Sequence, residues 1–116
     1  MFRPGTDESN VQYEDVLCNF CHRAWDPDDP SRPMVEGHRG SCICHACLAV
    51  AYAELTPQPS RVDAGQGPCT MCLEDRPEPH WTSPARDAAR ICRRCARMAA
   101  VVLERDPDAG WSRPTA

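Results

Sequence analysis

The sequence is poor in the residues that build a large protein core, and it contains no lysine. Leu, Ile, Val and Phe together make up only 16 of the 116 residues. That share is about 14%, and a share below about 20% indicates a chain that cannot fill a packed core unaided. A chain of this length also buries only a modest part of its surface. Something other than aliphatic packing must therefore stabilise the fold.

The charge balance is acidic, which argues against general binding of nucleic acid. All 13 basic residues are arginine, and 17 acidic residues give a formal net charge of −4. Long hydrophobic runs are also missing: the longest, residues 46–53, has eight residues, whereas a helix needs about 20 to span a bilayer. Residues 1–10 carry no apolar stretch typical of a secretory signal. We therefore expect a cytoplasmic protein whose thiols stay reduced.

Cysteine is the residue that the chain has in excess. Nine cysteines are present, and eight of them form four C-x-x-C pairs. In the two halves of the chain, 22 and 19 residues separate one pair from the next, so the pattern indicates two copies of one unit. An odd number of cysteines in a reducing compartment favours metal binding over disulfides.

Each unit has the spacing of a four-cysteine zinc site. One C-x-x-C turn brings two sulfur atoms to an ion, and a second turn completes the tetrahedron. Such a site has no open coordination position, so it is structural rather than catalytic. We predict two zinc ions per chain, held by Cys18, Cys21, Cys44 and Cys47 and by Cys69, Cys72, Cys92 and Cys95.

Other interpretations of the cysteines are weaker. Isolated buried cysteines do not explain the pairing, and a redox dithiol would need a βαβ pattern that the sequence lacks. Residues 18–22 match the motif for c-type haem, but the second copy has Leu73 in place of the histidine. Crossed pairing of the first pair with the third is an alternative to the sequential pairing that the repeat favours. Cys42 is left over, and the other candidate ligands, expected at the surface, are His22, His38, His45 and His80.

The second pair of each unit leads into a segment of helical composition. Pro57 and Pro107 follow these segments, and proline cannot continue a helix. We expect a small zinc-stabilised α+β fold of two tandem fingers, each a short hairpin plus one helix with little independent core. The predicted parts are an N-terminal tail (1–15), a first finger (16–56), a linker (57–66), a second finger (67–105) and a C-terminal tail (106–116). Both tails are expected to be loose unless a partner orders them.

The first unit resembles a known family. Residues 18–21 (CNFC), 35–37 (VEG) and 42–48 (CICHACL) look like the N-terminal zinc-binding domain of ClpX, the unfoldase ATPase of a bacterial protease. The resemblance covers residues 16–56 and implies a treble-clef-like finger that forms dimers and receives adaptors and substrate proteins. The second unit is a diverged copy that keeps the cysteines, Ile91 and the helix.

The predicted function is that of a protein-interaction module, and not that of an enzyme. The sequence shows no Ser/His/Asp or Cys/His arrangement and no carboxylate pair in an apolar setting. The module would serve as an adaptor, a dimerisation element or a complex subunit, and its partner would be a protein, including unfolded or adaptor proteins, or a second copy. Neither a membrane nor a small-molecule substrate is expected. The candidate contact residues are Phe20, Trp25, Val35, Leu48, Tyr52 and Trp81, with Met98 as a further apolar candidate.

Leu55 and Val102 are further apolar candidates for partner contact. For Leu48, Leu55 and Val102, however, a place in the core is favoured, because they lie on the helical stripe that faces the metal. Trp25 and Trp81 fall in polar, proline-bearing segments, where an exposed aromatic ring is available to a partner.

An alternative function is nucleic-acid binding through the second finger. Residues 86–105 have a net charge of +4, and arginines at helical spacing would form a basic stripe against phosphate. The competing interpretation is a solvated helix face that also neutralises the zinc thiolates. It is favoured because no aromatic residues interleave the stripe. The candidate phosphate contacts are Arg90, Arg93, Arg94 and Arg97.

Overall fold

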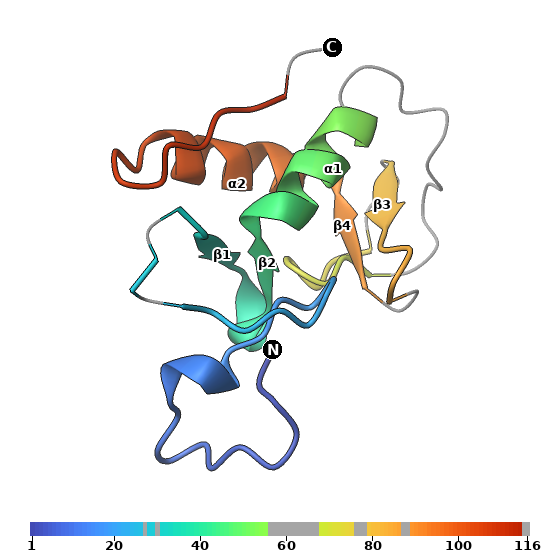
Figure 1. The fold of residues 1–116 in the computed structure, drawn as a ribbon. Coiled ribbons are helices and arrows are strands. Elements are labelled where there is room, and N and C mark those ends of the chain that lie inside the picture. The colour runs from blue at the N-terminus through green and yellow to red at the C-terminus, as the bar shows by residue number, and fades with distance from the viewer. Residues whose placement is uncertain (27, 30, 56–67, 76–78, 87–88, 115–116) are drawn as a thin grey trace.

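The computed structural model describes residues 1–26, 28–29, 31–55, 68–75, 79–86 and 89–114. Each unit consists of a two-stranded antiparallel hairpin that leads directly into a helix (Figure 1). The first unit has β1 (Met34–Glu36), β2 (Cys42–Cys44) and α1 (His45–Leu55), and the second has β3 (His80–Thr82), β4 (Arg90–Cys92) and α2 (Arg93–Glu104). The predicted small α+β fold is confirmed, whereas the predicted linker lies outside the described residues.

The two hairpins are built in the same register relative to the cysteines. Val35 lies opposite Ile43 in the first hairpin, and Trp81 lies opposite Ile91 in the second. Both isoleucines are fully buried, and the next residue, a cysteine, ends each strand. The first hairpin reverses through a short 3-10 helix, η2 (His38–Gly40).

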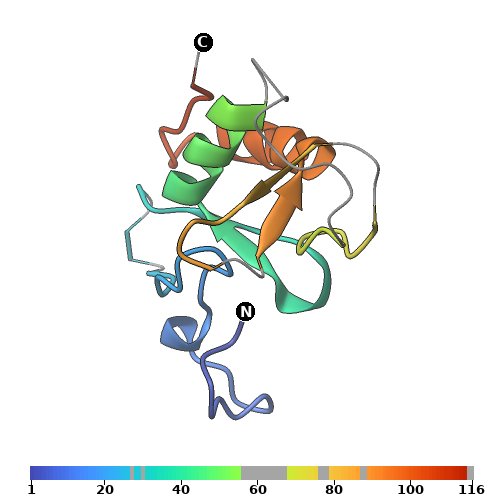
Figure 2. The same cartoon turned by 90° about the vertical axis from the view of Figure 1, so that its right-hand side faces the viewer.

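The two units share one hydrophobic core. α1 packs against α2, and each helix also contacts a strand of the other unit, α1 with β3 and α2 with β1. Figures 1 and 2 show the two helices side by side over the hairpins. The packing is therefore reciprocal, because each helix contacts a strand of the other unit. The buried cluster takes equivalent residues from both units, namely Ile43 and Ile91, Ala51 and Ala99, and Leu55 and Leu103.

The buried faces of the helices follow from this packing. Leu48 and Leu55 on α1 are buried as expected. Val102 on α2 was expected in the core, but its side chain is 55% exposed. The reason is the register of the helix: Leu103, not Val102, takes the position on α2 that Leu55 takes on α1, and Leu103 is 2% exposed. In the described part of the chain, no helix is both long and apolar enough to cross a membrane.

Both terminal segments contact the rest of the chain, in contrast to the expectation of loose tails. Near the N-terminus, Phe2 forms a β-bridge with Val16, next to the short 3-10 helix η1 (Tyr13–Asp15). At the other end, the Trp111 indole N–H donates a hydrogen bond to the backbone oxygen of His45 at 3.2 Å. This tryptophan also packs against the shared core. An aromatic anchor therefore holds the C-terminal segment over the first unit.

Candidate metal centres

Four cysteine sulfur atoms meet in each unit. The first two cysteines of each set lie in a loop before the hairpin, the third ends the second strand, and the fourth lies in the first turn of the helix. All four sulfur atoms of a set lie within 4.8 Å of one another. The Cys21 and Cys44 sulfur atoms are 3.7 Å apart, and tetrahedral zinc with Zn–S bonds of ~2.3 Å requires about 3.8 Å. The sets are Cys18, Cys21, Cys44 and Cys47, and Cys69, Cys72, Cys92 and Cys95.

These sets are the sequential ones, so the crossed pairing does not form. All nine cysteines are free thiols in this structure, and each set contains only cysteine donors. His38 is exposed, and His22 and His45 are half-buried. His80 is 1% exposed on β3, so the expectation of a surface residue is wrong for His80. The arrangement provides two all-sulfur groups, each suited to one metal ion.

The first C-x-x-C turn of each unit has the same local geometry. The residue after the pair has a φ of 62° in both units, at His22 and at Leu73. This left-handed conformation turns the chain back, so that the His22 amide donates to the Cys18 backbone oxygen and the Leu73 amide to the Cys69 backbone oxygen, both at 2.8 Å. The conformation is strained for a residue with a side chain. The same conformation at both positions makes it a common feature of the C-x-x-C loops that begin the two units.

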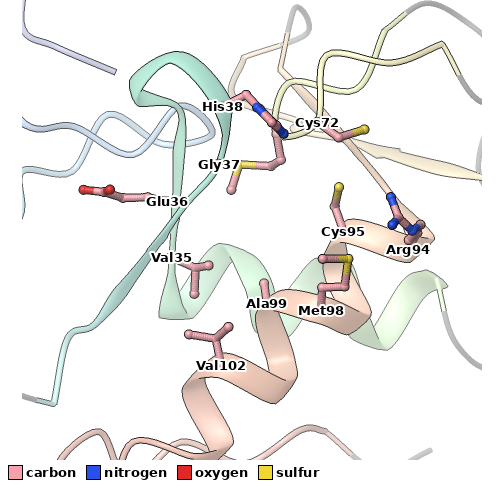
Figure 3. Close-up of a pocket in the computed structure, with 11 residues that line it drawn as sticks. Val35, Glu36, Gly37, His38, Cys72, Arg94, Cys95, Met98, Ala99 and Val102 are labelled. Atoms are coloured by element: carbon pink, nitrogen blue, oxygen red, sulfur yellow. The ribbon is translucent and has the colours of Figure 1, made fainter.

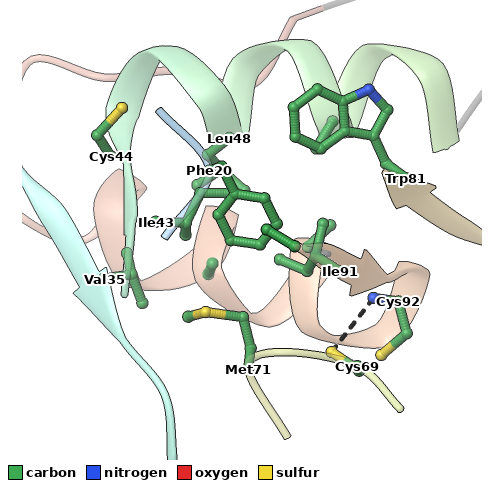
Figure 4. Packing of buried hydrophobic residues seen from close by; sticks show 14 of the residues in the cluster. Phe20, Val35, Ile43, Cys44, Leu48, Cys69, Met71, Trp81, Ile91 and Cys92 are labelled. Atoms are coloured by element: carbon green, nitrogen blue, oxygen red, sulfur yellow. Dashed lines mark hydrogen bonds between the residues drawn. The ribbon is translucent and has the colours of Figure 1, made fainter. Parts of the chain in front are cut away.

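Backbone amides point at the buried sulfur atoms. Cys18 Sγ accepts hydrogen bonds from the Phe20 and Cys44 amides, both at 3.3 Å. In the second unit, Cys69 Sγ accepts the Cys92 amide at 3.4 Å (Figure 4). Amide hydrogen bonds stabilise a thiolate, which is the form that binds a metal. In the folded chain, these amides therefore favour the thiolate form of Cys18 and Cys69.

The thiols of one set cannot all ionise on their own. Hydrogen bonds with the side chains of Cys44 and Cys47 lower the pKa of Cys18 to about 2, whereas the hydrogen bond with Cys18 raises the pKa of Cys44 to about 12. The second set repeats this pattern: Cys92 lowers the pKa of Cys69, and Cys69 raises the pKa of Cys92 to about 12. Four thiolates at such short distances require a cation. The donor chemistry therefore fits a divalent metal with an affinity for sulfur.

Each C-x-x-C loop is also held by the hairpin of the other unit. The His38 amide of the first unit donates to the backbone oxygen of Met71 at 2.8 Å. In return, the Ser83 hydroxyl of the second unit donates to the backbone oxygen of Phe20 at 2.6 Å. At Gly37, an added Cβ would lie 2.5 Å from the Met71 backbone oxygen, so only glycine permits this approach. The two metal centres are therefore coupled through the backbone.

The ninth cysteine lies beside the first metal centre without belonging to it. Cys42 is fully buried, its thiol donates to the backbone oxygen of Leu17 at 2.9 Å, and burial raises the pKa of this thiol. We expect Cys42→Ser to keep both metal ions, because a serine hydroxyl can make the same hydrogen bond. The expected cost is about 1–2 kcal/mol of stability, since a hydroxyl is less apolar than a thiol. Metal analysis with a urea titration tests this, and loss of an ion from the folded variant would contradict it.

The residues predicted to contact a partner belong mostly to the core. Of the six candidates, five are buried, with exposures between 0% and 9%. The Phe20 and Trp81 rings stack at 5.8 Å between centroids, which joins the first unit to the second. Only Trp25 remains half-buried, edge-on to Tyr13 at 5.1 Å. The residues corrected from contact surface to core are Phe20, Val35, Leu48, Tyr52 and Trp81.

The predicted arginine stripe is not one exposed face. Arg94 and Arg97 are exposed on α2, whereas Arg90 and Arg93 are half-buried. The Nε and Nη2 atoms of Arg93 are buried and have no hydrogen-bond partner among the described residues. Two of the nitrogen atoms that would contact phosphate are therefore buried, which disfavours Arg93 as a phosphate contact.

The sequence interpretation missed a groove between the two units. It has a volume of about 390 Å³ and lies between β1, α2 and the loop of the second unit that contains Cys69 and Cys72. The only signal in the sequence is the apolar character of Met98 and Val102, which are 54% and 55% exposed. Because the groove contains residues from both units, their relative placement has to be known before it can be found.

Comparison of this chain with known proteins found no match. No family model matches the sequence, and neither a curated protein nor a solved structure matches it. The resemblance of residues 16–56 to the ClpX zinc-binding domain therefore stays a prediction. The function has to be argued from the geometry of the two cysteine groups and from the exposed surface.

Proposed function

We propose that this protein is a structural-zinc module that acts by binding another protein. The observation that carries the proposal is the pair of all-cysteine groups on the two sides of one core. Four sulfur donors fill the tetrahedral coordination of Zn²⁺, so a bound ion has no position for water or substrate. Zinc in such a site supplies folding free energy rather than catalysis. The chemistry of the groups is therefore that of a scaffold and not of an enzyme.

Two features support a single metal ion in each group, and the chemistry of four sulfur ligands then favours zinc. Each group is compact enough for one ion, with sulfur atoms no more than 4.8 Å apart. Two cysteines of each group are buried and two are half-buried, so the loops close around a single ion. Tetrahedral sites of four sulfur atoms hold zinc or iron, and zinc is the usual ion in a purely structural role.

The likeness of the first unit to the ClpX zinc-binding domain leads us to propose a related role in receiving adaptor or substrate proteins. In this chain, the equivalent helices α1 and α2 already pack against each other. We therefore propose a monomer whose partner is a different protein, rather than a homodimer. The alternative, nucleic-acid binding, rests on the exposed Arg94 and Arg97, and the net charge of −4 opposes it.

Native mass spectrometry of protein purified without added metal tests the metal assignment and the oligomeric state together. We expect the mass of one chain plus two zinc ions. A strong chelator should remove both ions and abolish the helical circular dichroism signal, because the aliphatic core is too small to fold alone. Elemental analysis distinguishes zinc from iron. A metal-free chain that keeps its fold would contradict the proposed structural role of zinc. A dimeric mass would contradict the proposed monomeric state.

A further inference from the structure

Residues of both units form the groove between β1, α2 and the Cys69–Cys72 loop, which is here called the α2 groove. Val35 and Gly37 come from the first hairpin, and Met71, Met98 and Val102 come from the second unit. Figure 3 shows Val35, Gly37, Met98 and Val102 around one open space, with the half-buried Cys72 and Cys95 at one end. Its walls are therefore fixed by the shared core, and the groove exists only when both units are folded.

Large apolar side chains line the α2 groove, although the chain has few such residues for its core. Met98 and Val102 leave 54% and 55% of their surfaces exposed, and Val101 beside them leaves 37%. The whole chain has only 16 Leu, Ile, Val and Phe residues. Apolar side chains gathered at an open groove indicate a surface that a partner covers.

The charged residues around the groove select the partner. Arg94 and Arg97 are the exposed arginines of α2, and the exposed Arg105 follows the last residue of the helix, Glu104. The one acidic residue of the helix, Glu104, forms an ion pair with Arg113. Glu36 of the opposite wall points away from α2 (Figure 3). The outer face of α2 is therefore basic and apolar on a chain whose net charge is −4, so it complements an acidic and apolar partner.

The same charges disfavour two other occupants. If a second copy packed its α2 antiparallel against this one, Arg94 and Arg105 of each copy would face each other, and like charges repel. A nucleic acid carries a charge on every phosphate, and these charges would lie against the apolar side chains of Met98 and Val102. A peptide, in contrast, can place apolar side chains in the groove and carboxylates beside the arginines. Its backbone N–H groups can also donate to the half-buried sulfur atoms.

We propose that the α2 groove binds a short acidic and apolar peptide segment of a partner protein, a proposal that rests on the protein-binding function argued above. Arg94 and Arg105 are separated by about 16 Å along the helix at ~1.5 Å per residue. An extended peptide of about five residues spans that distance at ~3.3 Å per residue. Hydrophobic anchors in the groove give affinity, and carboxylates on the arginines give orientation.

Fluorescence anisotropy with three labelled probes tests the proposal on the full zinc-loaded chain. The probes are a peptide of about ten residues with alternating leucine and glutamate, the same peptide with lysine for glutamate, and a single-stranded DNA of similar charge. Met98→Gln/Val102→Thr keeps side-chain size while it removes apolar surface. Val50→Thr is the matched control, because Val50 is 48% exposed at the Met98-equivalent position on α1.

We expect the glutamate peptide to bind at least about tenfold more tightly than the lysine peptide. The groove variant should weaken its binding about tenfold, and Val50→Thr should leave it unchanged. No binding, equal binding to the groove variant, or preference for the lysine peptide overturns the groove assignment. If the DNA binds and displaces the glutamate peptide, the proposed peptide ligand is wrong and the groove binds nucleic acid instead. Zinc content is measured for every sample, so failure of the metal scaffold is distinguished from failure of the groove.

Discussion

Cys44→Ser is expected to abolish the folded state of the whole chain, including the second metal centre that the substitution does not touch. Cys44 ends β2, is 1% exposed and belongs to the first sulfur group. Structural zinc contributes about 10–16 kcal/mol to the folding of small zinc domains, whereas domains are stable by only about 5–15 kcal/mol in total. Loss of one of the two ions therefore removes a free energy comparable with the whole stability of the folded state.

The second centre should be lost with the first because the units have no separate cores. Phe20 of the first C-x-x-C loop stacks on Trp81 of the second unit, and Ser83 donates to the backbone oxygen of Phe20. If the first loop unfolds, Trp81 and the inner face of α2 lose their packing. The second unit would then have to fold around its cysteine group with only its own residues of the shared core.

Metal analysis, circular dichroism and tryptophan fluorescence of Cys44→Ser measure this outcome directly. We expect less than one zinc per chain, a random-coil spectrum and solvent-exposed tryptophans. Cys42→Ser is the matched control, because it makes the same chemical change two residues away. A Cys44→Ser chain with one tightly bound zinc and native α2 would mean that the second unit folds alone.

Much of each unit can be predicted from its sequence because the signals are local. Two C-x-x-C turns that share an ion need a fixed spacing, so the cysteine positions alone identified the two groups that the structure assembles. Proline after each helical segment placed the helix ends close to Leu55 and Glu104. These features depend on neighbours within a few residues or on a single ion.

The relation between the units could not be predicted, because it depends on long-range packing. Ala51 and Ala99 allow α1 and α2 to approach closely, but alanine is common in any helix and gives no sign of its partner. Trp81 seemed available to a partner because prolines and polar residues surround it. Its place opposite Ile91 in a three-residue strand puts it in the core instead, and a strand this short shows no readable alternation.

The C-terminal segment shows the same limit. Trp111 lies in a polar, proline-bearing sequence with no periodicity, and its indole reaches the backbone oxygen of His45 in the other unit. Arg113 then pairs with Glu104 and donates to the Tyr52 hydroxyl at 2.9 Å. The contacts of Trp111 with His45 and of Arg113 with Tyr52 join residues that are more than 60 positions apart, so composition alone indicates a loose tail.

Phe20→Ala is expected to destabilise both units together by about 3–5 kcal/mol, the usual cost of removing a fully buried phenylalanine. Phe20 is 0% exposed, lies between the first two metal ligands and stacks on Trp81 with an interplanar angle of 29°. The matched control is Tyr13→Ala, which also removes an aromatic pair, with Trp25. Tyr13 is 57% exposed, so its removal should cost no more than about 1 kcal/mol.

A double-mutant cycle between Phe20 and Trp81 separates this coupling from simple loss of packing. Urea titrations of the zinc-loaded wild type, Phe20→Ala, Trp81→Phe and the double variant give the interaction energy of the pair. We expect about 0.5–1.5 kcal/mol, the value typical of aromatic pairs, together with one unfolding transition seen by fluorescence and by circular dichroism. If the interaction energy were zero and two transitions appeared, the units would be independent. A single transition with measurable coupling means that the two units unfold together and that the stacking of Phe20 on Trp81 contributes to joining them.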